Sequence, residues 1–386
     1  MNMARGVYTP FEERFDWKEK GQQHPVPIPP VGETDPNEDG RTPLSDQKGS
    51  VSAKHDPVRY YKIPMETLRV DTITGFDLYL RIHEDGETKY VLYRAKDLRF
   101  EEKHKDRLSD SRVLEIHIRT ADRKVYNRYL EDNLDAIITN PKLTEEKQSK
   151  IVYDCANNLV QEVFESRRIG KVIPRVSRMV TNTVDHLHKG TKAFHSLLRI
   201  MTHDYYTYTH SVNVCVIGIA LAQKCAVKGN DLKALGSGLL LHDIGKSKID
   251  VTILNKNGPL NGDEWRIMKT HPEVGAQLVK ESRPAKAVTL QIIRQHHEKC
   301  TGRGYPLGLV GEEIHLFSKI AALADVYDAL TTNRAYKGAA DAYPAIHLMQ
   351  QEMAEDFCPD LFEKLVLLLN IDAKDGSFGY LGRGVH

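Results

Sequence analysis

Apolar and polar residues alternate in three stretches of the N-terminal half of the chain, which is the pattern of half-buried β-strands. The alternation covers residues 76–82, 89–95 and 113–120, and a Glu-Asp-Gly turn separates the first two stretches. Residues 98–108 are charged, with apolar positions at helical spacing. The pattern predicts a small α+β domain over residues 58–132.

The strand pattern disappears after about residue 129, and apolar residues then recur at helical spacing. Ile151, Cys155, Leu159 and Val163 fall on one helical stripe, and further apolar helices follow with short turns marked by Gly or Pro. The predicted fold class is therefore mainly α, with an all-helical C-terminal bundle after the small N-terminal α+β domain.

The first part of the chain has a different composition from the rest. Residues from about 20 to 55 are rich in Pro, Gly, Asp and Ser and cannot bury much apolar surface, which predicts a disordered arm. The expected organisation is a disordered arm, an α+β domain with a regulatory or dimerising role, connecting helices and a helical domain: residues 1–57, 58–132, 133–190 and 191–386.

Charge and hydropathy exclude several classes of protein. The net charge of the 386 residues is only +1, so nothing indicates a nucleic acid polymer or a membrane surface as a partner. The longest apolar stretch, Val214 to Ala222, is far shorter than the roughly 20 residues that a bilayer requires. The N-terminus has no apolar signal core, and the five cysteines are scattered, which predicts a cytoplasmic protein without a disulfide framework.

Histidines and aspartates occur on, or at the ends of, several apolar helices of the C-terminal half. An aspartate is costly to bury there unless it meets a cation or a hydrogen-bond donor. Imidazole and carboxylate without thiolate are the ligands of a hydrolytic centre with two metal ions. The candidate ligands are His210, His242, Asp243, His271, His296, His297 and Asp325.

Other polar residues of this region have simpler interpretations. We expect His186, His188, His195, His315 and His347 to be surface or core residues. For Glu298, which follows the histidine pair, two interpretations are equally open: it orients a neighbouring imidazole, or it forms a surface salt bridge.

The motifs together resemble those of HD-GYP phosphodiesterases, a branch of the HD metal-dependent phosphohydrolase superfamily. The resemblance covers residues of about 195–370, close to half of the chain. It depends on the order and spacing of five segments: DYYTYTHSVNV, HDIGK, GPLNGDEWRIMKTHPEVGA, HHEKCTGRGYP and ALADVYDALTTNRAYK.

The resemblance implies a cyclic di-GMP phosphodiesterase that opens its substrate to linear pGpG. Some members of the family cleave pGpG further to GMP. The implied nucleophile is a water molecule that two divalent metal ions activate. The resemblance also implies that one ion is bound by His210, His242, Asp243 and Asp325. The second ion is bound by His271, His296 and His297, with Asp243 bridging both. Histidine and carboxylate ligands suit iron for these two ions, with manganese as the alternative. Asp243 and Lys246 are the implied catalytic residues, and the implied substrate contacts are Gly304, Tyr305, Arg334 and Lys337.

Two positions depart from the pattern of the family. Thr301 stands where many members have Asp, which puts some hydrogen bonds of the loop in doubt. Tyr206 stands where some members have a Glu associated with a third metal ion, which favours two ions here.

The sequence leaves several alternatives open. The chain could be a cyclic dinucleotide receptor or signalling protein with little turnover, or another nucleotide phosphohydrolase of the HD superfamily. Cyclic GMP-AMP also remains open as the substrate. The N-terminal domain could mediate a homodimer or bind partner proteins, or it could be a passive packing module.

Overall fold

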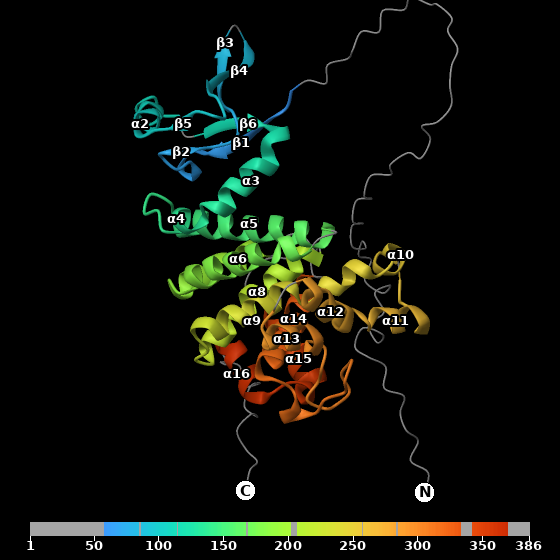
Figure 1. The fold of residues 1–386 in the computed structure, drawn as a ribbon. Coiled ribbons are helices and arrows are strands. Elements are labelled where there is room, and N and C mark those ends of the chain that lie inside the picture. The colour runs from blue at the N-terminus through green and yellow to red at the C-terminus, as the bar shows by residue number, and fades with distance from the viewer. Residues whose placement is uncertain are drawn as a thin grey trace, which may run out of the picture. The chain divides into compact units, whose positions relative to one another are not determined.

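A computed structural model describes residues 58–84, 86–113, 115–166, 169–201, 207–256, 258–282, 285–332 and 342–369 (Figure 1). The described chain divides into two compact units, of which the first ends at Asn133 and the second begins at Leu134. The predicted disordered arm lies outside the described residues.

The first unit contains a four-stranded antiparallel sheet in the order β1-β6-β3-β4 and a separate two-stranded sheet formed by β2 and β5. Its elements are β1 (Tyr60–Pro64), β2 (Thr72–Ile73), β3 (Leu78–Glu84), β4 (Glu87–Arg94), β5 (Arg99–Phe100), α2 (Glu102–Asp110), β6 (Glu115–Arg119) and α3 (Arg123–Asp132), with short 3₁₀ turns η2 (Met65–Thr67) and η3 (Thr120–Asp122).

The alternation in the sequence determines which face of this sheet is buried. Ile63 of β1 lies opposite Ile116 of β6, and both side chains are fully buried in the core of the unit. One expectation needs correction, because residues 98–108 are not all helical. Arg99 and Phe100 form β5, and α2 begins only at Glu102, after a capping box in which His104 accepts a hydrogen bond from the Glu101 backbone N–H.

The second unit is all-helical. Its elements are α4 (Leu134–Ile138), α5 (Glu145–Glu165), η4 (Ile169–Lys171), α6 (Ile173–Leu187), α7 (Thr191–Ile200), α8 (Thr207–Lys224), α9 (Gly229–Leu241), η5 (Ile244–Lys248), α10 (Val251–Leu254), α11 (Gly262–Met268), α12 (His271–Ser282), α13 (Ala287–Gln295), η6 (Gly311–Glu313), α14 (Leu316–Thr332), α15 (Ala342–Met353), η8 (Ala354–Asp356) and α16 (Pro359–Leu368). A helical unit after a small unit that contains the strands confirms the predicted mainly α fold.

Helix α8 is the centre of the helical unit. Every residue from Thr209 to Ala222 is buried, because α5, α9, α14 and α16 pack around this helix. Within the described residues, no helix combines the length and the apolar character needed to cross a bilayer.

A close backbone approach connects η5 to α12. A Cβ atom at Gly245 would overlap the carbonyl oxygen of His271. Only glycine therefore fits here without a shift of the backbone. This contact brings His242 and Asp243, which directly follow α9, close to the start of α12.

Candidate metal centre

All seven predicted metal ligands lie in one cluster of the helical unit. They come from α8 (His210), the C-terminal end of α9 (His242 and Asp243), the first residue of α12 (His271), the end of α13 (His296 and His297) and α14 (Asp325). Their ligand atoms form two groups, in each of which the atoms lie within 4.8 Å of one another: His210, His242 and Asp325; and Asp243, His271, His296 and His297.

The carboxylate of Asp243 lies between the two groups. Its Oδ2 atom is 3.4 Å from His242 Nε2 and 3.8 Å from His210 Nε2. Its Oδ1 atom is 3.3 Å from His271 Nε2 and 3.8 Å from His296 Nε2. The two oxygens therefore face different groups, as a bridging carboxylate requires.

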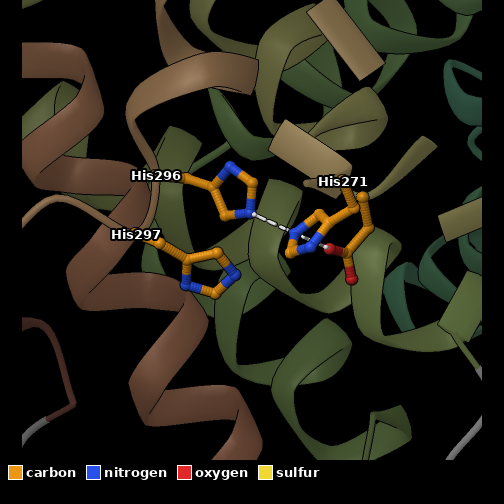
Figure 2. A group of neighbouring side chains, drawn as sticks. His271, His296 and His297 are labelled. Carbon is orange, nitrogen blue, oxygen red and sulfur yellow. Dashed lines mark hydrogen bonds and ion pairs between the residues drawn. The ribbon is translucent and has the colours of Figure 1, made fainter. Parts of the chain in front are cut away.

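Figure 2 shows the second group, in which the rings of His296 and His297 lie beside each other and face His271. The Nε2 atoms of His271 and His296 are 3.2 Å apart. These three imidazoles come from two elements, the start of α12 and the end of α13, and their ligand atoms lie within 4.8 Å of one another, as expected of ligands to one ion.

Hydrogen bonds at Nδ1 fix the orientation of four of the five imidazoles. Nδ1 of His242, His271 and His296 lies 2.7–2.8 Å from the carbonyl oxygen three residues earlier, that of Leu239, Met268 and Ile293 respectively. A carbonyl can only accept, so each Nδ1 carries the proton and donates. Each Nε2 therefore keeps its lone pair and directs it into the cluster.

His210 is held differently, by a residue that the sequence interpretation missed. Its Nδ1 lies 2.7 Å from Oδ2 of Asp328, which is buried on α14. Asp328 follows Asp325 by three residues and lies on the same face of the helix. This spacing of two acidic residues on an apolar helix is the signal in the sequence that could have found Asp328.

The electrostatics of the cluster favour the protonation states that bind metal. Burial alone would raise the pKa of Asp243, but the Lys246 ammonium and His242 hold that pKa well below its usual range. Burial lowers the pKa of His297 to about 3 and that of His296 well below its usual range. At neutral pH the carboxylate is therefore ionised and these imidazoles are neutral, as metal binding requires.

Two buried atoms of the cluster indicate that the residues fit a metal ion. Among the described residues, His242 Nε2 and Asp243 Oδ1 have no hydrogen-bond partner. A buried polar atom without a partner is costly, and a cation would satisfy both atoms. The histidine and carboxylate donor set suits a divalent transition metal.

Lys246 lies at the edge of the centre. Its Nζ donates a 2.7 Å hydrogen bond to Oδ2 of Asp243, and its side chain remains 21% exposed. The ammonium is therefore both attached to the carboxylate and accessible from outside the cluster.

The loop after the histidine pair corrects one of the two interpretations of Glu298. This side chain is 2% exposed, so it forms no surface salt bridge, and among the described residues no direct hydrogen bond joins it to an imidazole. Instead its carboxylate accepts hydrogen bonds from the backbone N–H groups of Leu307 and Leu309. A Cβ atom at Gly304 would clash with the backbone of Glu298, so this tight loop needs the glycine of the motif.

The departure at Thr301 does not remove the hydrogen bonds of the loop. Its Oγ1 donates to Oδ1 of Asp356, a buried residue of η8. Asp356 also accepts from Nζ of Lys299, and its carbonyl oxygen accepts from the backbone N–H of Cys300. Three other predicted positions, Tyr206, Arg334 and Lys337, lie outside the described residues.

The fold and the cluster together define a helical bundle with a buried histidine and carboxylate centre. The family model of the HD domain matches residues 165–361, and the chain therefore belongs to the HD domain family. This membership confirms the HD-type fold that the resemblance implied for the helical unit.

Curated relatives of the chain are cyclic dinucleotide phosphodiesterases. A cyclic di-GMP phosphodiesterase of Pseudomonas aeruginosa is 35% identical over 229 residues, which cover 59% of this chain and 55% of the relative. The 3'3'-cGAMP-specific phosphodiesterase 3 of Vibrio cholerae is 35% identical over 166 residues, which cover 43% of this chain and 36% of the relative. The chain thus spans about half or less of the length of these two relatives.

A solved structure supports the fold over most of the chain. It is that of a HDG"Y"P protein from Bdellovibrio bacteriovorus, with a TM-score of 0.57 and 23% identity. The match covers 81% of this chain and 99% of that protein. At this identity, the match shows that the fold is shared.

Proposed function

We propose that the chain is a metal-dependent phosphodiesterase that hydrolyses cyclic di-GMP to linear pGpG. The observation that carries this proposal is the position of Asp243, whose two oxygens face two separate groups of buried histidines. The names of the curated relatives support the choice of a cyclic dinucleotide as the substrate.

The ligands are assigned from these two groups. His210, His242 and Asp325 would hold one divalent ion, His271, His296 and His297 would hold the other, and both ions would share the carboxylate of Asp243. When bound, two such ions supply Lewis acidity to the phosphoryl oxygens and lower the pKa of water.

The residues of the chain prepare the site for an anionic substrate. The carbonyl groups of Leu239, Met268 and Ile293 keep the Nδ1 atoms protonated, so the Nε2 lone pairs stay available. The partly exposed ammonium of Lys246 offers positive charge to a phosphate beside Asp243. The substrate contacts proposed beyond this centre are Gly304, Tyr305, Arg334 and Lys337.

We propose two ions per chain, iron in the active protein with manganese as the alternative. Tyr206 stands four residues before His210 in the sequence, and a phenol with a pKa near 10 is a poor ligand for either metal. Because a third ion would assist a second cleavage, pGpG is the proposed main product, and its conversion to GMP is slow.

3'3'-cGAMP is the second candidate substrate, because a relative that is 35% identical is specific for it. The test measures kcat/KM of the iron-loaded full chain for cyclic di-GMP and for 3'3'-cGAMP, with the products separated by chromatography. A higher kcat/KM for cyclic di-GMP supports the proposal, and the reverse order supports the second candidate. Tight binding of cyclic di-GMP without hydrolysis would contradict both and would indicate a receptor.

A further inference from the structure

One imidazole of the centre is held in a different way from the other four. Nδ1 of His297 faces Oδ2 of Asp325 at 3.7 Å, which is longer than a hydrogen bond. Its ring instead lies against the ring of Tyr305, with centroids 4.6 Å apart and 27° between the planes. The His296 ring, with its centroid 4.2 Å away, and the Tyr305 ring therefore both contribute to the orientation of His297, and of these two only Tyr305 is not a proposed ligand.

The place of Tyr305 depends on the loop that carries it. The backbone N–H of Tyr305 donates a 3.1 Å hydrogen bond to the carbonyl of His297. Just after Tyr305, the Glu298 carboxylate accepts from Leu307 N at 2.7 Å and from Leu309 N at 2.9 Å. Because this carboxyl group is buried and accepts both hydrogen bonds, Glu298 fixes the second half of the loop.

The first half of the loop has a separate anchor. Asp356 accepts hydrogen bonds from Thr301 Oγ1 at 2.8 Å and from Lys299 Nζ at 2.9 Å. Loss of the Glu298 contacts should therefore release the segment that carries Tyr305 while the segment before it stays attached to η8.

We propose that Tyr305 and Glu298 are positioning residues for His297. Tyr305 holds the imidazole by stacking on it, and Glu298 holds Tyr305 by binding the backbone beyond it. The inference rests on the proposed role of His297 as a metal ligand. It differs from a role of Tyr305 in substrate contact, because it predicts an effect on metal binding when no substrate is present.

The test measures Mn²⁺ binding to the full chain by equilibrium dialysis, without substrate. Tyr305→Ala should lower the affinity for one of the two Mn²⁺ ions by about tenfold. This is the lower end of the loss seen when a residue that orients a metal ligand is removed. Tyr305→Phe keeps the stacked ring and should bind as the wild type does. Glu298→Gln, which keeps the size of the side chain, should weaken the same ion by about fivefold, as expected for one lost hydrogen bond.

The double variant Glu298→Gln/Tyr305→Ala tests whether Glu298 affects metal binding only through Tyr305. It should bind Mn²⁺ no more weakly than Tyr305→Ala alone. Glu313→Gln is the matched control, because Glu313 is exposed and accepts one backbone hydrogen bond from Val310 at the end of the same loop. This variant should bind as the wild type does.

Limited trypsin digestion gives a readout that needs neither metal nor activity. Glu298→Gln should increase cleavage after Arg303, within the loop, while Glu313→Gln leaves that cleavage unchanged. Wild-type Mn²⁺ affinity in Tyr305→Ala, or additive losses in the double variant, would overturn the inference while leaving the proposed function intact. Failure of the wild type to bind either Mn²⁺ or iron would overturn the proposed function, and the inference with it.

Discussion

At the scale of single residues, the centre depends on carboxylates that serve more than one partner. Asp243 faces imidazoles on both sides and also accepts a hydrogen bond from Lys246. Asp328 is not a proposed ligand, but it determines which nitrogen of His210 faces the cluster. Changes at these two residues should therefore have different effects on metal binding.

Replacement of Asp243 should remove both ions together. Asp243→Ala deletes the only carboxylate proposed to contact both groups, and it removes the acceptor of the hydrogen bond from the Lys246 ammonium. We expect metal content near zero and loss of hydrolysis, measured by elemental analysis and by chromatography of the product. Asp250→Ala, an exposed helix cap seven residues later, is the control and should retain both ions. An active Asp243→Ala protein would refute the bridging role.

Replacement of Asp328 should affect one ion selectively. Asp328→Asn can no longer stabilise the protonated Nδ1 of His210 with a carboxylate, so the affinity of the first group should fall by roughly 10- to 100-fold. In dialysis against increasing concentrations of chelator, the variant should lose one ion at a lower chelator concentration than the wild type does. It should lose the second ion at the same chelator concentration as the wild type. Equal loss of both ions would show that Asp328 acts on the whole bundle.

At the scale of helices, a buried pair of side chains connects α5 to α6. Ser149 Oγ lies 2.8 Å from His186 Nε2, and both side chains are fully buried. Burial, together with the charge of Lys189, lowers the pKa of His186 to about 4. The folded protein therefore keeps this imidazole neutral under conditions in which the unfolded chain would protonate it.

This pair predicts a pH dependence of stability. The stabilising contribution of neutral His186 is complete above the unfolded pKa of about 6.5 and falls as the pH decreases from there toward 4. Urea unfolding at pH 7.5 and pH 5, with chelator present, should show a larger loss of unfolding free energy in the wild type than in His186→Gln. The prediction fails if both proteins lose the same amount, because the loss would then come from other groups.

The helices also explain what could be predicted from the sequence. The ligands could be found because each is a polar residue on or beside an apolar helix, in the order of a known motif set. Glu298 and Asp356 could not be placed, because their partners are backbone N–H groups and loop side chains that the periodicity of the sequence does not reveal. β5 was missed because Arg99 and Phe100 form a strand too short to produce an alternation.

At the scale of the whole molecule, the centre joins parts of the chain that are far apart in sequence. The hydrogen bond between His210 and Asp328 spans 118 residues, and the remaining ligands lie between these two positions. Unfolding separates them, so the metal ions bind the folded helical unit much more tightly than the unfolded chain.

Metal loading should therefore stabilise the helical unit. Ligand binding to the folded state alone adds about 2.7 kcal/mol at a free concentration 100 times the Kd. Calorimetry of the full chain should show a higher Tm with Mn²⁺ than with chelator, and Asp243→Ala should show no such shift. An equal shift in that variant would mean that the ions stabilise the protein at another place.

The decisive experiment uses the full chain, loaded with iron under anaerobic conditions. The rate of cyclic di-GMP consumption is followed by chromatography, and the iron content of the same sample is determined. We expect catalytic turnover with accumulation of pGpG at close to two iron ions per chain. Absence of turnover at that iron content, with Mn²⁺ loading equally inactive, would contradict the assignment of this centre to cyclic di-GMP hydrolysis.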